Sequence, residues 1–400
     1  MNLLKSTSIF WFAAILLLSQ QACKPSFSTI VKFGRVSAED FKETLDFDIN
    51  RGLIILPVNI KGETYRFLFD TGAPNSISKS LQKQLKFKTL SKGHIVDSEG
   101  NRSEVKYVGV DTIWLGNVPF IDQTAFVGDF EANPAIKCLN IDGIIGSNLM
   151  RLCNWKIDMK NQKMVFGKTT LHTAENYPQS LSFKTDKQYN LRVDLETGDA
   201  TLTNLKIDYG SNGSLSVPDK VFQVLIDRNI IKQTSTISGQ SQKGITGEIN
   251  TSQRQTAYLD TLRFHTLAMQ DVTILSGGSG LIGTDLLSKA VVIIDWSQQL
   301  LFFEEVDNSP IHESTFGFTV GLSESNTPYV QSVRENSSAH EQGIRPNMQV
   351  IRIDYMDFSK SHSYCDYFLG KIDKPSITVV LKDEKGVEKK VVVEKRPLHP

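Results

Sequence analysis

The chain has 400 residues, of which 40% are hydrophobic and 22% are charged. Its 44 basic and 44 acidic residues exclude the basic excess of a nucleic-acid-binding surface and the acidic surplus of a protein built for a very acidic lumen. This length exceeds one ordinary hydrophobic core, so we expect two or three globular units.

The N-terminal segment, residues 1–23, is predicted to be a targeting signal. Lys5 precedes an apolar run from Ile9 to Leu18, which fits a secretory signal. The run is too short to span a membrane, which takes about 20 residues. Cys23 follows Ala22 and resembles the lipidation site of bacterial lipoproteins, although Gln20 departs from that motif.

That resemblance implies a periplasmic or cell-envelope lipoprotein of a Gram-negative bacterium, anchored to the membrane by a lipid on Cys23. Plain signal cleavage, without lipidation, is the alternative. Either way the sequence predicts an exported protein.

An internal repeat organises the chain at an offset of 137 to 138 residues. Residues 67–78, "FLFDTGAPNSIS", align with residues 205–216, "LKIDYGSNGSLS", so that Asp70 matches Asp208 and Gly72 matches Gly210. Residues 144–166 align without a gap on residues 281–303. Two copies of one lobe are the simplest explanation, with boundaries at residues 24–168 and 169–308.

Each copy predicts the same order of elements, most of them strands. Alternating apolar residues predict a strand pair before each aspartate, at residues 52–70 and 189–208. Short amphipathic helices follow at 78–85 and 217–228. A polar hairpin is expected at 94–105 in the first copy, and a final hairpin at 155–166 and 291–303.

The turn at residues 69–73, followed about 70 residues later by Ile144-Ile145-Gly146 and then repeated, resembles the aspartic peptidases of the retropepsin and pepsin type over residues 40–305. The resemblance implies a mainly β fold. Two tandem retropepsin-like, or acid-protease, lobes would form a bilobal pepsin-like unit, with an apolar-apolar-Gly segment crossing behind each Asp turn. It implies an aspartic endopeptidase with catalytic Asp70 and Asp208, and no cofactor.

The chemistry explains why two carboxyl groups are needed. Hydrolysis of a peptide bond by water alone requires one group to deprotonate the water while another protonates the carbonyl oxygen. Two adjacent carboxyls that share one proton provide both. Gly72 and Gly210 would shape the two turns, and Ala73 completes the first motif. By the resemblance, Thr71 braces the opposite lobe, and a polypeptide substrate lies extended beneath the hairpin near Asp97 to Arg102.

The second turn departs from the family pattern. Tyr209 stands where Thr or Ser belongs, and its ring does not fit the slot of a small hydroxyl without repacking. Ser211 offers a nearby hydroxyl in compensation. Three outcomes stay open: a working dyad, an inactive second lobe, or activity only when two first lobes dimerise. A catalytically inactive peptide-binding protein of the same fold is the alternative function.

Two glycine-rich stretches imitate nucleotide sites. Gly278 to Gly283 satisfies G-x-G-x-x-G, but the first copy keeps only the last glycine pair, which argues against a dinucleotide site. Gly239 to Thr246 imitates a phosphate loop but has Ile245 in place of the essential lysine, and is expected to form a mobile loop. The scattered histidines indicate no zinc site.

Three cysteines remain beyond the signal: Cys138, Cys153 and Cys365. In an oxidising compartment Cys138 and Cys153 could pair, whereas buried free thiols are the alternative. An odd count without C-x-x-C spacing predicts neither a disulfide framework nor a metal site.

Residues 309–400 are expected to form a third unit. Gly317-Phe318, the strand at 329–333 and a short helix before residues 343–354 resemble a PDZ domain, although "TFGF" departs from the usual Gly-Leu-Gly-Phe. The resemblance implies that loop N–H groups around Gly317 and Phe318 hold a C-terminal carboxylate while the peptide adds a strand. A β-rich cap that serves only stability is the alternative.

Overall fold

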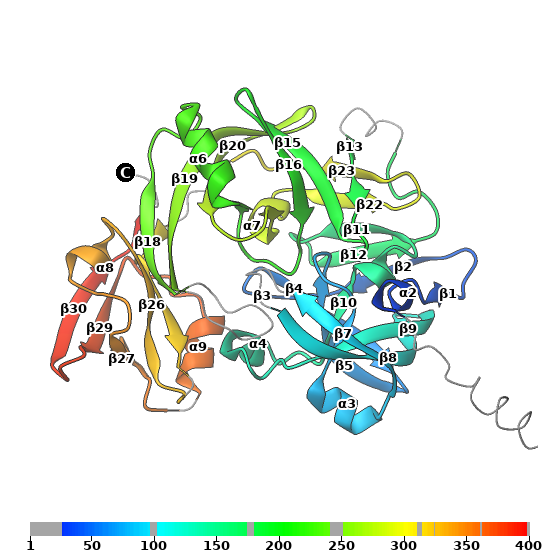
Figure 1. Cartoon of the computed structure of the whole chain (residues 1–400), viewed down its shortest axis with the longest axis horizontal. Helices are drawn as coiled ribbons and strands as arrows, with labels where there is room; N and C mark the ends of the chain where they lie inside the picture. The colour runs from blue at the N-terminus through cyan, green and yellow to red at the C-terminus, as the bar shows by residue number, and fades with distance from the viewer. Residues whose placement is uncertain are drawn as a thin grey trace, which may run out of the picture.

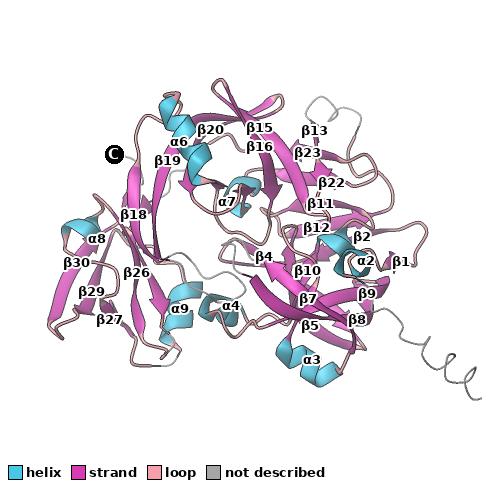
Figure 2. Cartoon of the chain, in the orientation of Figure 1, coloured by secondary structure: helices cyan, strands magenta, loops and turns pink. Residues whose placement is uncertain are grey.

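The computed structural model describes residues 26–96, 102–173, 180–240, 251–309, 314–323, 325–360 and 362–397. The fold is mainly β, as the sequence predicts, and two β lobes carry a third unit (Figures 1 and 2). The signal segment and Cys23 lie outside these ranges. Within them, no helix has both the length and the apolar character that a membrane crossing requires.

The first lobe is built on a nine-stranded sheet. Its elements are α2 (Phe27–Ile30), β1 (Arg35–Val36), β3 (Asp48–Asn50), β4 (Leu53–Ile60), β5 (Glu63–Asp70), β6 (Ser76–Ser78), α3 (Lys79–Leu85), β7 (Lys88–Val96), β8 (Arg102–Leu115), β9 (Val118–Gly128), α4 (Pro134–Leu139), β10 (Gly143–Gly146) and α5 (Ser147–Met150). The predicted hairpin is the antiparallel pair β7–β8. Residues 97–101 lie outside the description, and with them most of the segment expected to cover a substrate.

The second lobe repeats the central connections of the first. Its elements are β14 (Lys184–Thr185), β15 (Leu191–Thr197), β16 (Ala200–Ile207), β17 (Leu215–Val217), α6 (Asp219–Asp227), β18 (Ser235–Gln240), β19 (Thr251–Phe264), β20 (Leu267–Ser276), β21 (Leu281–Ile282) and α7 (Thr284–Leu287). β10 runs parallel to β5 and antiparallel to β6, and β21 has the same relations to β16 and β17. Both predicted amphipathic helices are present as α3 and α6.

The two copies meet in a six-stranded sheet. Its strands are β13 (Leu181–Ser182), β23 (Leu300–Glu304), β22 (Val291–Asp295), β11 (Asn154–Asp158), β12 (Lys163–Gly167) and β2 (Lys42–Asp46), in that spatial order. β11 pairs with its own repeat β22, with Trp155 opposite Ile294, Lys156 opposite Ile293 and Ile157 opposite Val292. The two copies are related by an offset of 137 residues. This offset exchanges the Trp155–Ile294 pair with the Ile157–Val292 pair and maps the Lys156–Ile293 pair onto itself, so the lobes join with pseudo-two-fold symmetry.

The third unit continues the sheet of the second lobe. Its elements are β24 (Ser314–Thr315), β25 (Phe318–Leu322), β26 (Pro328–Arg334), α8 (Ser338–Glu341), β27 (Gln349–Ile353), β28 (Met356–Asp357), α9 (Ser363–Leu369), β29 (Ser376–Lys382), β30 (Glu388–Glu394) and β31 (Arg396–Pro397). Figure 1 shows β26 beside β18, and the two strands pair antiparallel with Ser238 opposite Val333. Gly239 and Gln240 therefore belong to a strand, and the rest of the expected mobile loop, 241–246, lies outside the described residues.

A disulfide attaches the same unit to the first lobe. Cys138 on α4 is bonded to Cys365 on α9, across 227 residues of chain. Of the two alternatives that the sequence left open, the pairing of Cys138 with Cys153 is therefore wrong, and the buried free thiol holds for Cys153 but not for Cys138. Cys153 is a free thiol buried in the main core, away from the surface where α4 meets α9. The third unit is thus held to one lobe by a strand pair and to the other by a covalent bond.

Candidate active site

The two Asp turns face each other, and their glycines make this approach possible. Asp70 ends β5 and Asp208 directly follows β16, and both residues are more than 90% buried. A Cβ added at Gly72 would lie 2.5 Å from the Asp208 carboxyl carbon, and one at Gly210 would lie 2.3 Å from the Asp70 carboxyl carbon. Each aspartate therefore occupies the space that a side chain of the opposite turn would need.

Each carboxyl group is also held by its own turn. The Gly72 N–H donates to Asp70 Oδ1 at 2.7 Å, and the Gly210 N–H donates to Asp208 Oδ1 at 3.0 Å. These bonds leave the second oxygen of each group available for other partners. The turns thus present two carboxyls in matching orientations from the two copies of the repeat.

The apolar-apolar-Gly segments cross behind the turns, as the family resemblance implies. A Cβ at Gly146 would lie 2.4 Å from the Ala73 carbonyl oxygen, and one at Gly283 would lie 2.2 Å from the Gly213 carbonyl oxygen. The last glycine of the G-x-G-x-x-G match is therefore needed for close packing of backbones, and the four-residue helix α7 that follows is no nucleotide crossover helix.

One side chain of the first turn braces the second lobe. The fully buried Thr71 hydroxyl donates to the Ile207 carbonyl at 2.7 Å and accepts from the Tyr209 N–H at 3.1 Å. The Tyr209 side chain makes no equivalent return bond to the first lobe among the described residues. Its ring is buried against Phe69, and its hydroxyl has no hydrogen-bond partner among the described residues.

The hydroxyl expected to compensate does not do so. Ser211 contributes its backbone, since its carbonyl accepts the Thr284 N–H at 2.8 Å, but its side chain makes no hydrogen bond within the described chain. Ala73 has the corresponding role in the first turn, where its carbonyl accepts the Ser147 N–H at 2.9 Å.

The structure adds Lys206, which the sequence reasoning missed. Its ammonium lies 2.8 Å from Asp208 Oδ2 and donates to the Gly72 carbonyl at 3.2 Å. The repeat contained the signal, because at the offset of 138 that matches Asp70 with Asp208, Lys206 aligns with Leu68. A charged residue two positions before the aspartate, on the same face of its strand, is the anomaly that could have identified it.

The buried charges favour a shared proton. Burial and, after it, the negative charge of Asp208 raise the pKa of Asp70 to about 7, although Lys206 and the Gly72 N–H oppose the shift. Burial alone would lower the pKa of Lys206, but the carboxyls of Asp208 and Asp70 raise it overall. Below neutral pH, the site therefore favours an ammonium ion at Lys206 and a carboxyl group at Asp70 that retains its proton.

Comparison with known proteins agrees with this geometry over part of the chain. Residues 56–149 match a family model described as aspartyl protease. The aspartyl protease match contains Asp70, Thr71 and the Ile144–Gly146 crossing, and it ends before the second turn. This match and the arrangement of the strands together support an aspartic-protease-like fold.

No curated protein matches the chain. Among solved structures, basic 7S globulin from soybean is similar with a TM-score of 0.39 and 11% sequence identity, over 67% of this chain and 95% of that chain.

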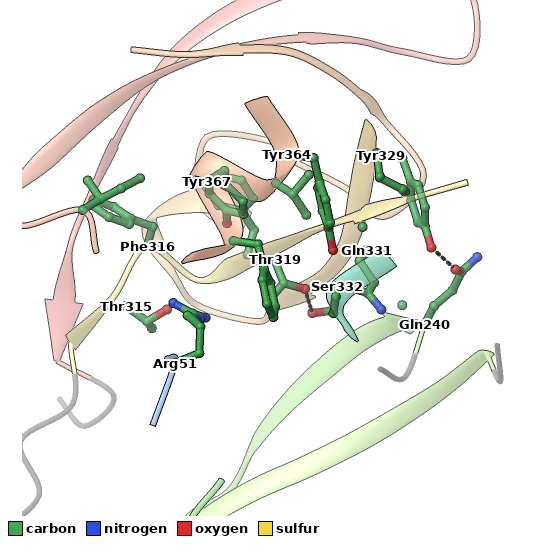
Figure 3. Close-up of a pocket in the computed structure, with 18 of the residues that line it drawn as sticks. Arg51, Gln240, Thr315, Phe316, Thr319, Tyr329, Gln331, Ser332, Tyr364 and Tyr367 are labelled. Carbon is green, nitrogen blue, oxygen red and sulfur yellow. Dashed lines mark hydrogen bonds between the residues drawn. The ribbon is translucent and has the colours of Figure 1, made fainter. Parts of the chain in front are cut away.

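A cavity of about 600 Å³ lies where the third unit meets both lobes (Figure 3). Its wall combines β25 and α9 with Arg51 of the first lobe and with Asn212 and Gln240 of the second. Tyr364 and Tyr367 project into it from α9. Asp70 and Asp208 are not among the described residues that line it, so this cavity lies beside the Asp turns rather than over them.

The loop expected to bind a peptide carboxylate borders this cavity. Phe318 lines it, and the neighbouring Gly317 has a φ of 84°, which favours glycine. A Cβ at Gly317 would lie 2.1 Å from the Ser337 side chain. The Gly317 N–H donates to Thr315 Oγ1 at 3.0 Å, so the described loop already satisfies one of its donors internally.

The described ranges contain no cluster of three or more His, Cys, Asp or Glu side chains arranged to hold a metal ion.

Proposed function

We propose that this protein is an aspartic endopeptidase in which Asp70 and Asp208 together activate one water molecule. The observation that carries the proposal is the mutual approach of the two turns, in which the glycine of each lies against the carboxyl of the other. A dyad of this kind needs two carboxyls close enough to share a proton, and the raised pKa of Asp70 fits that state.

The proposed steps balance as follows. Asp208 takes a proton from the attacking water as the water oxygen bonds to the scissile carbonyl carbon, and the proton on Asp70 passes to the carbonyl oxygen. The resulting diol collapses with cleavage of the C–N bond, and the departing nitrogen takes the proton from Asp208 while Asp70 recovers its own. No cofactor takes part in these steps.

The test is mass-spectrometric detection of peptide-library cleavage by the full exported chain across a range of pH, beside Asp70→Asn and Asp208→Asn. Each variant is expected to lose about 10²-fold or more, the range for removal of an acid–base group. Asp199→Asn, in an exposed turn, is the matched control. Loss only in Asp70→Asn would leave the second lobe as scaffold and point to dimers of first lobes. No cleavage by the wild type at any pH would overturn the proposal.

The alternative is a peptide-binding protein without catalysis. Two observations favour it: Tyr209 replaces the bracing hydroxyl, and Lys206 occupies one oxygen of Asp208. In that case the wild type and Asp70→Asn would bind the same library peptides equally, and neither would cleave them.

We further propose that the third unit recruits polypeptides by their C-terminal carboxylate. Arg51 brings a cation from the first lobe to the wall of the cavity beside β25, where a chain end would lie (Figure 3). Peptides with a free carboxylate should bind at least ten times more tightly than their amides, and Arg51→Gln should reduce that ratio. Equal binding of acid and amide would support a role in stability alone.

Export and lipid anchoring through Cys23 remain part of the proposal. Intact-mass measurement of the membrane fraction should find a diacylglyceryl adduct that Cys23→Ser lacks. Plain signal cleavage would leave an unmodified, soluble chain.

A further inference from the structure

Lys206 connects the two lobes at the carboxyl pair. It lies on β16, and its side chain is only 12% exposed. Its ammonium contacts Asp208 Oδ2 in its own lobe at 2.8 Å and the Gly72 carbonyl of the other lobe at 3.2 Å. An ammonium with so little exposure is stable there because both contacts are polar and one is a carboxylate.

The contact of Lys206 runs from the second lobe to the first, opposite to that of the Thr71 hydroxyl. The Thr71 hydroxyl reaches from the first turn to the Ile207 carbonyl and the Tyr209 N–H of the second lobe. The Tyr209 side chain sends no polar group back, since its hydroxyl has no partner among the described residues. Lys206 does, because its bond to the Gly72 carbonyl runs from the second lobe to the first. The return contact therefore comes from two residues before the aspartate instead of one residue after it.

The charged groups around Lys206 hold its ammonium at the dyad. Asp208 and Asp70 attract it from the two Asp turns, and Arg192 faces it from β15, where the two residues are register partners. The Arg192 guanidinium also pairs with Asp186, at 3.2 Å. Arg192 opposes the carboxyls, because its positive charge lowers the pKa of Lys206 whereas Asp208 and Asp70 raise it.

We propose that Lys206 is a positioning residue of the catalytic pair, which fixes Asp208 as the carboxylate partner and sets the pH range in which the pair shares one proton. This inference rests on the proposed peptidase function. A cation in contact favours the charged form of a carboxyl, so it lowers the pH at which the pair loses each of its protons. Removal of the cation must move both limits upward.

The first experiment compares the pH dependence of kcat/KM for the wild type, Lys206→Met, Lys206→Arg and the exposed control Lys220→Met. Lys206→Met should shift both limbs of the profile by about one pH unit or more toward higher pH, as expected for loss of a contacting opposite charge. Lys206→Arg keeps the charge and should keep the position of the profile even if kcat falls. A Lys206→Met profile at the wild-type position overturns the proposal, whether or not the maximal rate changes.

A second measurement separates this inference from the proposed function. ¹³C NMR titration of the Asp carboxyl carbons, assigned with Asp70→Asn and Asp208→Asn, needs no turnover. An upward shift of both titrations in Lys206→Met without any wild-type cleavage would refute the peptidase and retain the role of Lys206 in ordering the carboxyl protons. Cleavage by the wild type, with carboxyl titrations that do not shift in Lys206→Met, would support the peptidase and refute the role of Lys206.

Discussion

The two Asp turns share a backbone and differ in their side chains. Both hold a carboxyl by a glycine N–H, both place that glycine against the opposite aspartate, and both have a crossing glycine behind them. The first turn adds the bracing hydroxyl of Thr71, whereas the second adds a buried ring and the ammonium of Lys206. The backbone features occur in both turns because each carboxyl needs them. The side-chain contacts between the lobes differ: Thr71 makes one from the first turn, and Lys206 makes another from the strand before the second turn.

The largest expected difference concerns Asp70 and pH. The pKa of Asp70 is about 7 in the folded protein, above its ordinary value of 3.8. Between about pH 4 and pH 7, therefore, Asp70 keeps its proton in the folded state but has lost it in the unfolded chain. Wild-type stability should therefore fall as pH rises from about 4 to 7, and Asp70→Asn should remove this loss. The gain of the variant over wild type should grow across that window by up to about 4 kcal/mol.

Denaturant unfolding at pH 4.5 and pH 8 measures this difference, with Asp199→Asn as the exposed control. The same gain at both pH values would show that the Asp70 carboxyl has an ordinary affinity for protons.

The duplicated backbone is tested by Gly72→Ala and Gly210→Ala. Each added Cβ would fall 2.3 to 2.6 Å from atoms of the opposite carboxyl, so each variant should lose about 10²-fold in kcat/KM through misplacement of the dyad. Gly213→Ala, where a Cβ meets nothing within 4 Å, is the matched control in the same turn. A strong effect at only one of the two glycines would break the symmetry inferred here.

The bracing hydroxyl predicts a smaller effect on stability. Thr71→Val would leave the Ile207 carbonyl and the Tyr209 N–H buried without their partner, at a cost of about 2 kcal/mol. Thr71→Ser keeps the hydroxyl and should lose less than about 1 kcal/mol for the missing methyl. Equal losses in thermal or denaturant unfolding would attribute the role of Thr71 to packing alone.

The smallest effect is expected for Tyr209→Phe, at the position equivalent to Thr71. The Tyr209 hydroxyl is buried without a partner among the described residues, so Tyr209→Phe should leave stability unchanged or raise it by up to about 1 kcal/mol. Tyr209→Thr, which restores the family pattern, should instead destabilise the fold by about 3 kcal/mol or more because it opens a cavity beside Phe69. A stable Tyr209→Thr variant would mean that the second turn can repack.

Local sequence patterns were sufficient for the features that lie within each copy. The strand pairs, the hairpin β7–β8, the helices after the turns and the crossing glycines all follow from alternation and from the repeat. Lys206 was missed because the alignment was used to find matches, whereas this residue is informative as a mismatch with Leu68.

Features between units could not be predicted in the same way. The pairing of β11 with β22 depends on how two lobes meet, and the bond between Cys138 and Cys365 depends on where the third unit docks. Cys153 was the nearer candidate along the chain, but its thiol faces a core that only the folded lobe defines. Contacts of this kind depend on surface complementarity, which spacing in one sequence does not encode.

The disulfide also has a consequence for the order of assembly. In an oxidising compartment a chain that emerges from its N-terminus exposes Cys138 and Cys153 long before Cys365, so the nearest pair available first is the wrong one. Folding of the first lobe removes that competitor, because burial raises the pKa of the Cys153 thiol and leaves it little thiolate for exchange. Cys138 on α4 then stays unpaired until the third unit docks. The Cys138–Cys365 bond therefore forms only in a chain whose three units have all folded and assembled.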